Sequence, residues 1–427
     1  MPSLRTEVAM DSDGSGALLF GGQYGPSSIA YNELWRYDGT TWTLLQPVGA
    51  PPPARSRFAA AYDPVRQRLV VFGGDAQYAG GGSLGDTWEW DPQTSTWTQM
   101  TPAATPTPRI HARLVFDPAN ANLLLFGGRG AGGSETWSWD GANWTLRTPT
   151  NVPPAREQTH LATNWGNGTV LMFGGSSAAA SGVLGDTWIW NGVDWNALAP
   201  ATTPGTGGLR NGKATYDFLR DRVVVHGGIT SGGGFSASAW EFDGIDWTQR
   251  LPATLPVGRT GAGFCYVAAL ERSVLFGGYN GAVQGDQWDY QTNAVATATT
   301  FGTGCPASLG VPTITAAARP WLGDTVAITT GNIPGTALPF VVAGLSTTAW
   351  VGGALPFSLA PYGFPACSLL VSNESQTFAL GPLSLTVPNA TGFLGVRLNY
   401  QAAALEPAGS GFTLGMSAGL TLTLGAR

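Results

Sequence analysis

Short apolar runs that end in a pair of glycines recur through the first three hundred residues of the chain. Typical runs are residues 17–20, 69–72, 123–126 and 223–226, and each is followed directly by two glycines. Six such doublets occur, and their first glycines lie 52, 54, 47, 53 and 50 residues apart. A period near fifty is typical of a four-stranded blade repeated around an axis. The pattern therefore predicts an all-β, six-bladed β-propeller.

Aromatic and other residues alternate after each doublet, as in Trp35, Arg36 and Tyr37, and this period of two indicates a strand with one packed face. A turn and a further tryptophan follow in five units, at Trp42, Trp97, Trp144, Trp195 and Trp247. An arginine introduces an extended run before each apolar run, at Arg5, Arg55, Arg109, Arg156, Arg210 and Arg259. Each unit thus contains four expected strands, A to D, with the glycine doublet at the end of strand B.

This unit resembles the kelch repeat, whose marks are the glycine doublet, a later Tyr and Trp pair, and an arginine before the next strand. The resemblance covers roughly residues 5–300 and implies a propeller. The last unit has no strand-D tryptophan after Tyr290, and we expect residues 294–300 to fill that place. Kelch propellers usually close by exchanging a strand between the first and last blades. Here both ends carry complete blades, so the sequence leaves the mode of closure open.

The pattern changes after residue 301, which predicts a propeller over residues 1–301 and a second domain over 302–427. Residues 302–427 contain several short alternating runs separated by Pro and Gly turns, which favours a small C-terminal β-sandwich. This part weakly resembles the C-terminal β modules of secreted bacterial repeat proteins, which implies sorting, anchoring or assembly. The alternative is a plain packing domain.

Charged residues make up only 11% of the chain, and Lys213 is its single lysine. An uncharged surface suits proteins outside the cell or proteins that pack on copies of themselves, although genomic base composition explains it equally well. Residues 1–301 carry 24 acidic and 18 basic residues, and residues 302–427 carry three of each. This balance gives no basic footprint for nucleic acid, and no apolar run is long enough for a membrane span.

Strands A to D alternate in direction, so the A–B and C–D turns share one end of the propeller, here called the turn end. The longer B–C and D–A loops share the other, the loop end, where we expect function. The strand-A arginines should meet acids there: Glu33, Asp86, Glu135, Asp186 and Asp286. We interpret this rim as structural ion pairs, with an anion site as the alternative. Loop aromatics are candidate ligand- or partner-binding residues, with loop packing as the alternative: Tyr24, Tyr31, Tyr78, Phe235 and Tyr279.

Cys305 and Cys367 lie in the second domain and are expected to form a disulfide, which suits an oxidising compartment. Some kelch propellers are copper oxidases or sugar epimerases, but His111, His160 and His226 fall within expected strands and suggest no metal site. We found no catalytic set, so we expect no enzymatic activity, no catalytic residue, no metal and no cofactor. The sequence favours a secreted or cell-surface interaction protein that binds protein partners or copies of itself through its two domains. The alternative is a glycan-binding or glycan-active propeller that uses the loop aromatics on an extracellular glycan.

Overall fold

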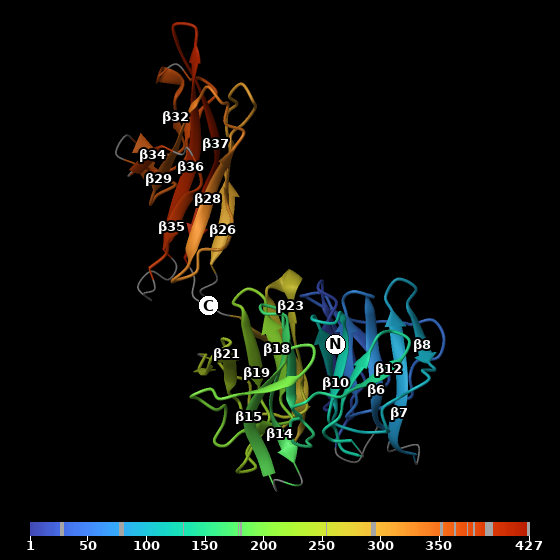
Figure 1. Ribbon diagram of the computed structural model, residues 1–427. Helices are drawn as coiled ribbons and strands as arrows, with labels where there is room; N and C mark the ends of the chain where they lie inside the picture. Colours follow the sequence, from blue (N-terminus) through green and yellow to red (C-terminus); the bar gives the residue numbers. More distant parts are fainter. Residues whose placement is uncertain are drawn as a thin grey trace. The chain divides into compact units, whose positions relative to one another are not determined.

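The computed structural model describes the chain apart from residues 26–29, 77–80, 131, 178, 180–181, 253, 292–295, 351–352, 363, 374, 379–380, 389–395 and 425–427. It divides into two compact units, Met1–Gln291 and Thr292–Arg427 (Figure 1). The boundary lies ten residues earlier than the predicted one at 301/302.

The first unit contains six antiparallel sheets of three or four strands, one for each sequence repeat, which confirms the predicted six-bladed β-propeller. Blades one to three contain β1 (Ala9–Ser12), β2 (Ala17–Phe20), β3 (Leu34–Tyr37), β4 (Trp42–Leu44), β5 (Ala59–Asp63), β6 (Arg68–Ala76), β7 (Gly81–Asp91), β8 (Thr96–Met100), β9 (Arg113–Asp117), β10 (Asn122–Phe126), β11 (Thr136–Trp139) and β12 (Trp144–Arg147). Blades four to six contain β13 (His160–Asn164), β14 (Thr169–Ser177), β15 (Gly182–Trp190), β16 (Trp195–Leu198), β18 (Lys213–Asp217), β19 (Arg222–His226), β21 (Ala239–Phe242), β22 (Trp247–Arg250), β23 (Gly263–Val267), β24 (Arg272–Tyr279) and β25 (Val283–Tyr290). A short pair, β17 (Leu209–Arg210) and β20 (Ile229–Thr230), flanks blade five, and the 3-10 turn η2 (Ala268–Leu270) joins β23 to β24.

In the five blades that have a strand-D tryptophan, this side chain packs on the phenylalanine before the glycine doublet of the preceding blade. Trp97 of blade two lies 5.0 Å from Phe20 of blade one, and Trp42 of blade one lies 5.3 Å from Phe276 of blade six, between ring centroids. Such aromatic pairs bury large areas and hold neighbouring sheets together. Blade six has no strand-D tryptophan, and the residue that it would cover in blade five is His226 instead of Phe. The two exceptions to the repeat thus fall at one interface.

The doublet must be glycine because two backbones approach it. In blade two, Gly73 and Gly74 have φ of +66° and +101°, in the left-handed region. A Cβ on Gly73 would lie 2.8 Å from the Arg109 carbonyl oxygen, and one on Gly74 would lie 2.8 Å from the Ser56 carbonyl oxygen. The Gly74 amide donates to that Arg109 carbonyl at 3.0 Å, and the second glycine donates in the same way in four other blades, so these doublets also join neighbouring blades.

The propeller closes without exchange of a strand, because β1 to β4 form blade one by themselves. One residue per blade forms a closed ring of backbone hydrogen bonds around the axis, in which each amide donates to the preceding carbonyl at 2.7–3.4 Å. We call this the axial ring: Glu7, Arg57, His111, Gln158, Asn211 and Gly261. The link from Glu7 to Gly261 joins blade one to blade six in the same way as the other five links.

Blade six has three strands among the described residues, so the expectation that residues 294–300 complete it was wrong. Instead β26 (Thr297–Phe301) pairs with β37 (Gly411–Thr423) of the second unit, from Thr297 opposite Thr423 to Phe301 opposite Gly419. An alternating strand does not reveal its partner, and here the pairing moves the boundary to residue 291.

The second unit contains two larger antiparallel sheets. The remaining strands are β27 (Thr313–Ala316), β28 (Thr325–Gly331), β29 (Leu338–Gly344), β30 (Ala349–Trp350), β31 (Gly353–Ala354), β32 (Phe357–Ser358), β33 (Ser368–Leu369), β34 (Ser375–Phe378), β35 (Leu383–Thr386) and β36 (Arg397–Ala408), with the 3-10 turn η3 (Ala360–Tyr362). One sheet has the order β26-β37-β36-β29-β34 and the other β27-β28-β35. Ile314 and Ile328 of the small sheet pack with Val341, Tyr400 and Leu420 of the large sheet. The assignment of this unit to the β-sandwich class stays a prediction.

Candidate functional site

Five blades carry the same ion pair at the loop end, between a buried arginine and a partly exposed carboxylate. The strand-A arginine lies 2.5–2.8 Å from the carboxylate just before strand C of its own blade, in Arg5–Glu33, Arg55–Asp86, Arg109–Glu135, Arg156–Asp186 and Arg259–Asp286. Each carboxylate also accepts the indole N–H of the first strand-C tryptophan. Each guanidinium also donates to the carbonyl of the first glycine of the doublet. These groups bond to one another within their own blade, so the arrangement suits a structural role.

The pair in blade two illustrates the electrostatics. Arg55 is buried and donates to both oxygens of Asp86 at 2.8 Å. Burial alone would raise the pKa of Asp86, but the hydrogen bonds and charge of Arg55 hold that pKa below its usual range. The carboxylate therefore stays ionised beside its partner.

Blade five lacks this pair. Leu209 occupies the position that arginine holds in the other blades. Its carbonyl oxygen lies against Gly174 of the preceding blade, just as the Arg109 carbonyl oxygen lies against Gly73. Ser238 replaces the acid, and Trp240 Nε1 has no hydrogen-bond partner within the described part of the chain. Arg210 lies one residue later, is half-buried and donates from Nη1 to Gln158 Oε1 at 2.9 Å. The structure thus places Arg210 outside the rim in which we expected it.

Side chains of the axial ring form a second paired network. His111 Nδ1 lies 3.0 Å from Glu157 Oε2, and His111 Nε2 lies 3.7 Å from Glu7 Oε2. Burial alone would lower the pKa of His111, but the two glutamates raise it above its usual range. Burial likewise would raise the pKa of Glu7, but His111 and Asn211 lower it to about 2. These groups therefore support one another's charges.

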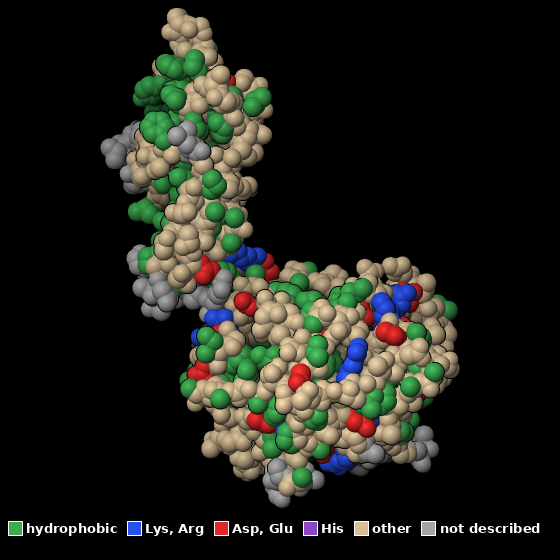
Figure 2. Space-filling view, viewed as in Figure 1, with side chains coloured by type: hydrophobic (Ala, Val, Ile, Leu, Met, Phe, Trp, Pro, Cys, Tyr) green, Lys and Arg blue, Asp and Glu red, His purple; other side chains and the backbone are tan. Residues whose placement is uncertain are grey.

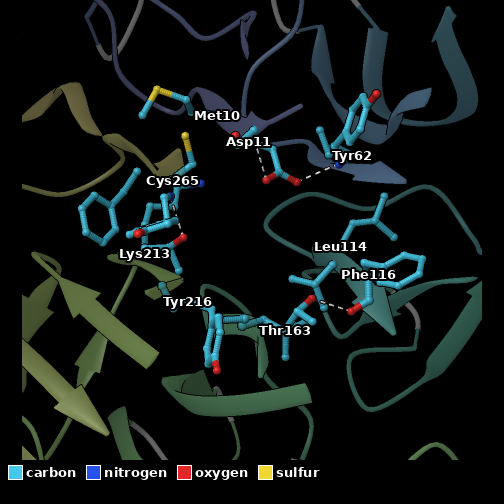
Figure 3. Close-up of a pocket in the computed structure, with 18 of the residues that line it drawn as sticks. Met10, Asp11, Tyr62, Leu114, Phe116, Thr163, Lys213, Tyr216 and Cys265 are labelled. Atoms are coloured by element: carbon cyan, nitrogen blue, oxygen red, sulfur yellow. Dashed lines mark hydrogen bonds between the residues drawn. The ribbon is translucent and has the colours of Figure 1, made fainter. Parts of the chain in front are cut away.

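A cavity of about 260 Å³ lies on the propeller axis, on the turn-end side of the axial ring (Figure 3). The innermost strands β1, β5, β9, β13, β18 and β23 supply most of its lining. The first residues of these strands form one layer, here called the floor layer: Ala9, Ala59, Arg113, His160, Lys213 and Gly263. The cavity therefore lies away from the loop end on which the sequence interpretation placed function.

Aromatic side chains surround the cavity toward the turn end, and we call them the aromatic mouth: Tyr62, Phe116, Trp165, Tyr216, Phe218 and Tyr266. Phe218 lies 5.0–5.8 Å from the rings of Trp165, Tyr216 and Tyr266, between centroids. Trp165 stacks on Phe116 at 5.3 Å. Phe218 is 51% exposed and Trp165 is 37% exposed, so part of the cluster faces solvent.

Two acidic and two basic side chains line the cavity: Asp11, Asp13, Arg113 and Lys213. Asp13 pairs with Arg36 at 3.1 Å. Asp11 accepts the amide hydrogens of Tyr62 at 2.7 Å and Ser12 at 2.8 Å (Figure 3), and burial raises its pKa to about 6. Burial, and then the charge of Arg113, lowers the pKa of Lys213 to about 7. Arg113 donates to the Thr159 carbonyl and to Asn211 Oδ1. Among the described residues, neither Arg113 nor Lys213 has a carboxylate close enough to form an ion pair.

The aromatics predicted on the long loops do not form one cluster. Tyr24 is 46% exposed, whereas Tyr31 lies under the Arg5 guanidinium, 4.2 Å from its ring centroid. Phe235 and Tyr279 meet edge to face at 5.9 Å. Tyr78 lies outside the described residues. The binding role expected for these aromatic side chains stays a prediction, and the contacts of Tyr31, Phe235 and Tyr279 also suit the alternative of loop packing.

The three histidines lie apart, in blades three, four and five. Burial lowers the pKa of His160 to about 3 and that of His226 to about 4, which keeps both neutral. Among the described residues, no group of three His, Cys, Asp or Glu side chains is placed to hold a metal ion. Cys305 and Cys367 are joined in a disulfide, and Cys265 is a buried thiol. No helix within the described ranges is long and apolar enough to cross a membrane.

The sequence interpretation missed the aromatic mouth and Lys213. The turn after strand A carries Pro64 in blade two and Pro118 in blade three, but Trp165 in blade four and Phe218 in blade five. A large aromatic residue at a turn position that elsewhere holds proline was a usable signal. The single lysine at the start of a buried strand was another.

Three comparisons with known proteins bear on the propeller. Residues 5–139 match the family described as the KLHDC2/KLHL20/DRC7 Kelch-repeats domain. Over 128 residues the chain is 35% identical to dynein regulatory complex subunit 7 of Chlamydomonas reinhardtii. The matched segment covers 29% of this chain and only 11% of that relative. The structure is similar to that of YjhT, with a TM-score of 0.51 and 15% identity over 67% of this chain and 95% of that one.

The match to YjhT supports the fold alone, because the identity is low. The kelch match covers the first blades, and the same blade geometry repeats through blade six. The first unit is thus a six-bladed β-propeller whose first blades match a kelch-repeat family.

Proposed function

We propose that this chain is a non-enzymatic interaction protein that acts outside the cell or at its surface. Its propeller binds a protein partner, and its second unit associates with further copies of the chain. The kelch match supports the first role, because kelch domains bind protein partners. The edge strands of the second unit support the other role.

The observation that carries self-association is the composition of these edges. The outer strands of the two larger sheets are β26, β34, β27 and β35, and none contains a charged residue or a proline. Edge strands of soluble proteins usually carry a charge, a proline or a bulge that blocks pairing with another chain. All four residues of β34 are exposed, and Phe378 is 69% exposed. Such an edge suits strand addition by a second copy.

The surface around these edges offers little charge repulsion. The face of the second unit visible in Figure 2 consists mainly of hydrophobic and uncharged side chains, with few charged ones. Residues 302–427 contain three acidic and three basic residues, so their formal net charge is zero. Low net charge favours association.

Analytical ultracentrifugation between 1 and 100 µM tests this proposal. We expect oligomers whose average mass rises with concentration and falls in Thr377→Lys, which places a charge in β34. Thr413→Lys, on the exposed β36–β37 hairpin, is the matched control and should associate like the unchanged chain. A monomer throughout this range would contradict self-association.

The disulfide supports an extracellular location, because such bonds persist in oxidising compartments. Fractionation of the native host followed by thiol labelling tests this. We expect the chain in the surface or extracellular fraction, with only Cys265 reactive after unfolding. Recovery from the cytosol with three free thiols would contradict the proposed location.

The alternative is a glycan-binding or glycan-active propeller. Tyr24 is the described loop aromatic that best suits stacking on a sugar, since Tyr31 covers Arg5 and Phe235 meets Tyr279 edge to face. Binding on a glycan array that Tyr24→Ala abolishes would favour this alternative over a protein partner.

A further inference from the structure

The floor layer of the axial cavity is cationic on one side and small on the other. Arg113, His160 and Lys213 follow one another in blades three, four and five. The other three members of the layer are Ala9, Ala59 and Gly263. Small side chains opposite large ones leave space beside the charged groups.

Neither cation of this floor has an ion-pair partner within the described chain. Glu7 acts electrostatically on both Arg113 and Lys213, and Glu157 acts on Arg113. Both glutamates are engaged elsewhere, because Glu7 accepts from Asn211 and faces His111, and Glu157 pairs with His111 and Arg129. Two further carboxylates line the cavity, but Asp11 accepts the Tyr62 and Ser12 amides and Asp13 pairs with Arg36. His160 is neutral, since burial lowers its pKa to about 3. Arg113 and Lys213 therefore leave a surplus of positive charge at the floor.

Lys213 is the more available of the two cations. Arg113 already donates to the Thr159 carbonyl and Asn211 Oδ1. The Lys213 side chain makes no hydrogen bond or ion pair within the described chain, and it is half-buried and lines the cavity. An ammonium group held partly out of water without an acceptor is costly, so it favours an acceptor brought by a ligand.

The other end of the cavity suits an aromatic group. Tyr216 lies three residues beyond Lys213 on β18, so the aromatic mouth begins about 10 Å above the floor at ~3.3 Å per residue. Tyr216, Phe218 and Tyr266 offer ring faces and edges at that level. The 260 Å³ volume corresponds to about nine water molecules at ~30 Å³ each, which limits the ligand to a small molecule.

We propose that the axial cavity binds a small aromatic carboxylate, with its carboxylate on Lys213 beside Arg113 and its ring within the aromatic mouth. The site is independent of the proposed partner-binding and self-association surfaces, because it lies inside the propeller at the turn end. The carboxylate supplies the missing ion-pair partner, and the ring displaces water from aromatic surfaces.

The probe is 3-phenylpropionate, whose length matches the distance from floor to mouth. Its neutral isostere, 3-phenylpropionamide, has the same shape and lacks the charge. Lys213 is the only lysine, so reductive methylation with ¹³C-formaldehyde labels this side chain and the terminal amine alone. We expect 3-phenylpropionate to shift the Lys213 signal in NMR spectra, and the amide to bind at least tenfold more weakly by calorimetry.

Variants separate this site from general anion binding. Lys213→Met retains the side-chain volume and should weaken 3-phenylpropionate binding at least tenfold, while Lys213→Arg should restore part of it. Arg210→Met removes a cation at the loop end and is the matched control with unchanged affinity. Circular dichroism establishes that each variant is folded. Equal binding of acid and amide, or full affinity in folded Lys213→Met, would overturn the proposal.

Discussion

Charged side chains are paired in the loop-end rim and lack an ion-pair partner at the floor of the axial cavity. At the loop end, Arg55 and its counterparts meet a carboxylate, a glycine carbonyl and a tryptophan in the same blade. Below the turn end, Lys213 and Arg113 line a cavity without a carboxylate partner among the described residues. Charge that is fully paired inside one blade stabilises the fold, whereas unpaired charge beside a cavity is available for a ligand.

Repetition separates the two cases further. The paired arginine recurs in five blades, as expected for a structural element that each blade needs. Lys213 and the aromatic side chains Trp165 and Phe218 occur once each, at positions where other blades carry different residues. Residues that depart from the repeat therefore indicate the candidate site better than residues that follow it. The following predictions test this contrast.

The largest effect is expected from Arg109→Ala at the loop end. The substitution leaves Glu135 and the carbonyls of Thr107, Gly127 and Gly132 without their buried donor. Arg109 is buried and Glu135 is partly exposed, so the loss of this donor from four acceptors should lower the free energy of unfolding by about 3 kcal/mol. Denaturant titration monitored by tryptophan fluorescence measures this.

Arg210→Ala provides the matched control for that prediction. Arg210 is half-buried and makes one side-chain hydrogen bond, to Gln158, so its loss should cost less than about 1 kcal/mol. Equal losses in the two variants would show that the rim pair has no special structural role.

The contrast also explains what could be predicted from the sequence. The glycine doublets and paired tryptophans define the blades because each has a local steric or packing cause that every unit shares. The ion pairs followed from strand direction alone. The cavity could not be predicted in this way, because Lys213 and Phe218 line a common space only when six strands from distant parts of the sequence meet at the axis. Residues 297–301 were misassigned because their alternation fits either unit, and only the pairing with β37 distinguishes them.

His111 at the axial ring should give a pH-dependent contribution. Its pKa is raised in the folded protein, so its stabilisation is complete below the ordinary pKa of 6.5 and is lost as the pH rises through the folded value. His111→Gln should therefore lower the free energy of unfolding by about 1.5 kcal/mol at pH 6 and by less at pH 9. Urea titrations at both pH values measure this difference, and a larger loss at pH 9 would contradict the paired network.

Lys213 should show the opposite dependence. Its pKa falls from 10.5 to about 7 on folding, so the unfolded chain binds more protons between these values and stability rises with pH. Lys213→Met should therefore raise the free energy of unfolding by about 1 kcal/mol at pH 6, and the gain should shrink above pH 7 and vanish above pH 10.5. Urea titrations without added ligand test this. A loss of stability at pH 6 would indicate that Lys213 is satisfied by the fold and would weaken the contrast between the two ends.

The smallest effect is expected in blade five, where the rim pair is missing. Trp240 Nε1 lacks an acceptor within the described chain, and Ser238 holds the position that an acid holds in the other blades. Ser238→Asp should supply this acceptor and raise the free energy of unfolding by about 0.5 kcal/mol, because the cost of burying a carboxylate offsets most of the hydrogen bond. The double substitution Leu209→Arg and Ser238→Asp should gain more than the two single changes added together, as expected for coupled partners. Additive effects would mean that the five natural pairs are independent side chains on a shared rim, and that the likeness between blades lies in their backbone alone.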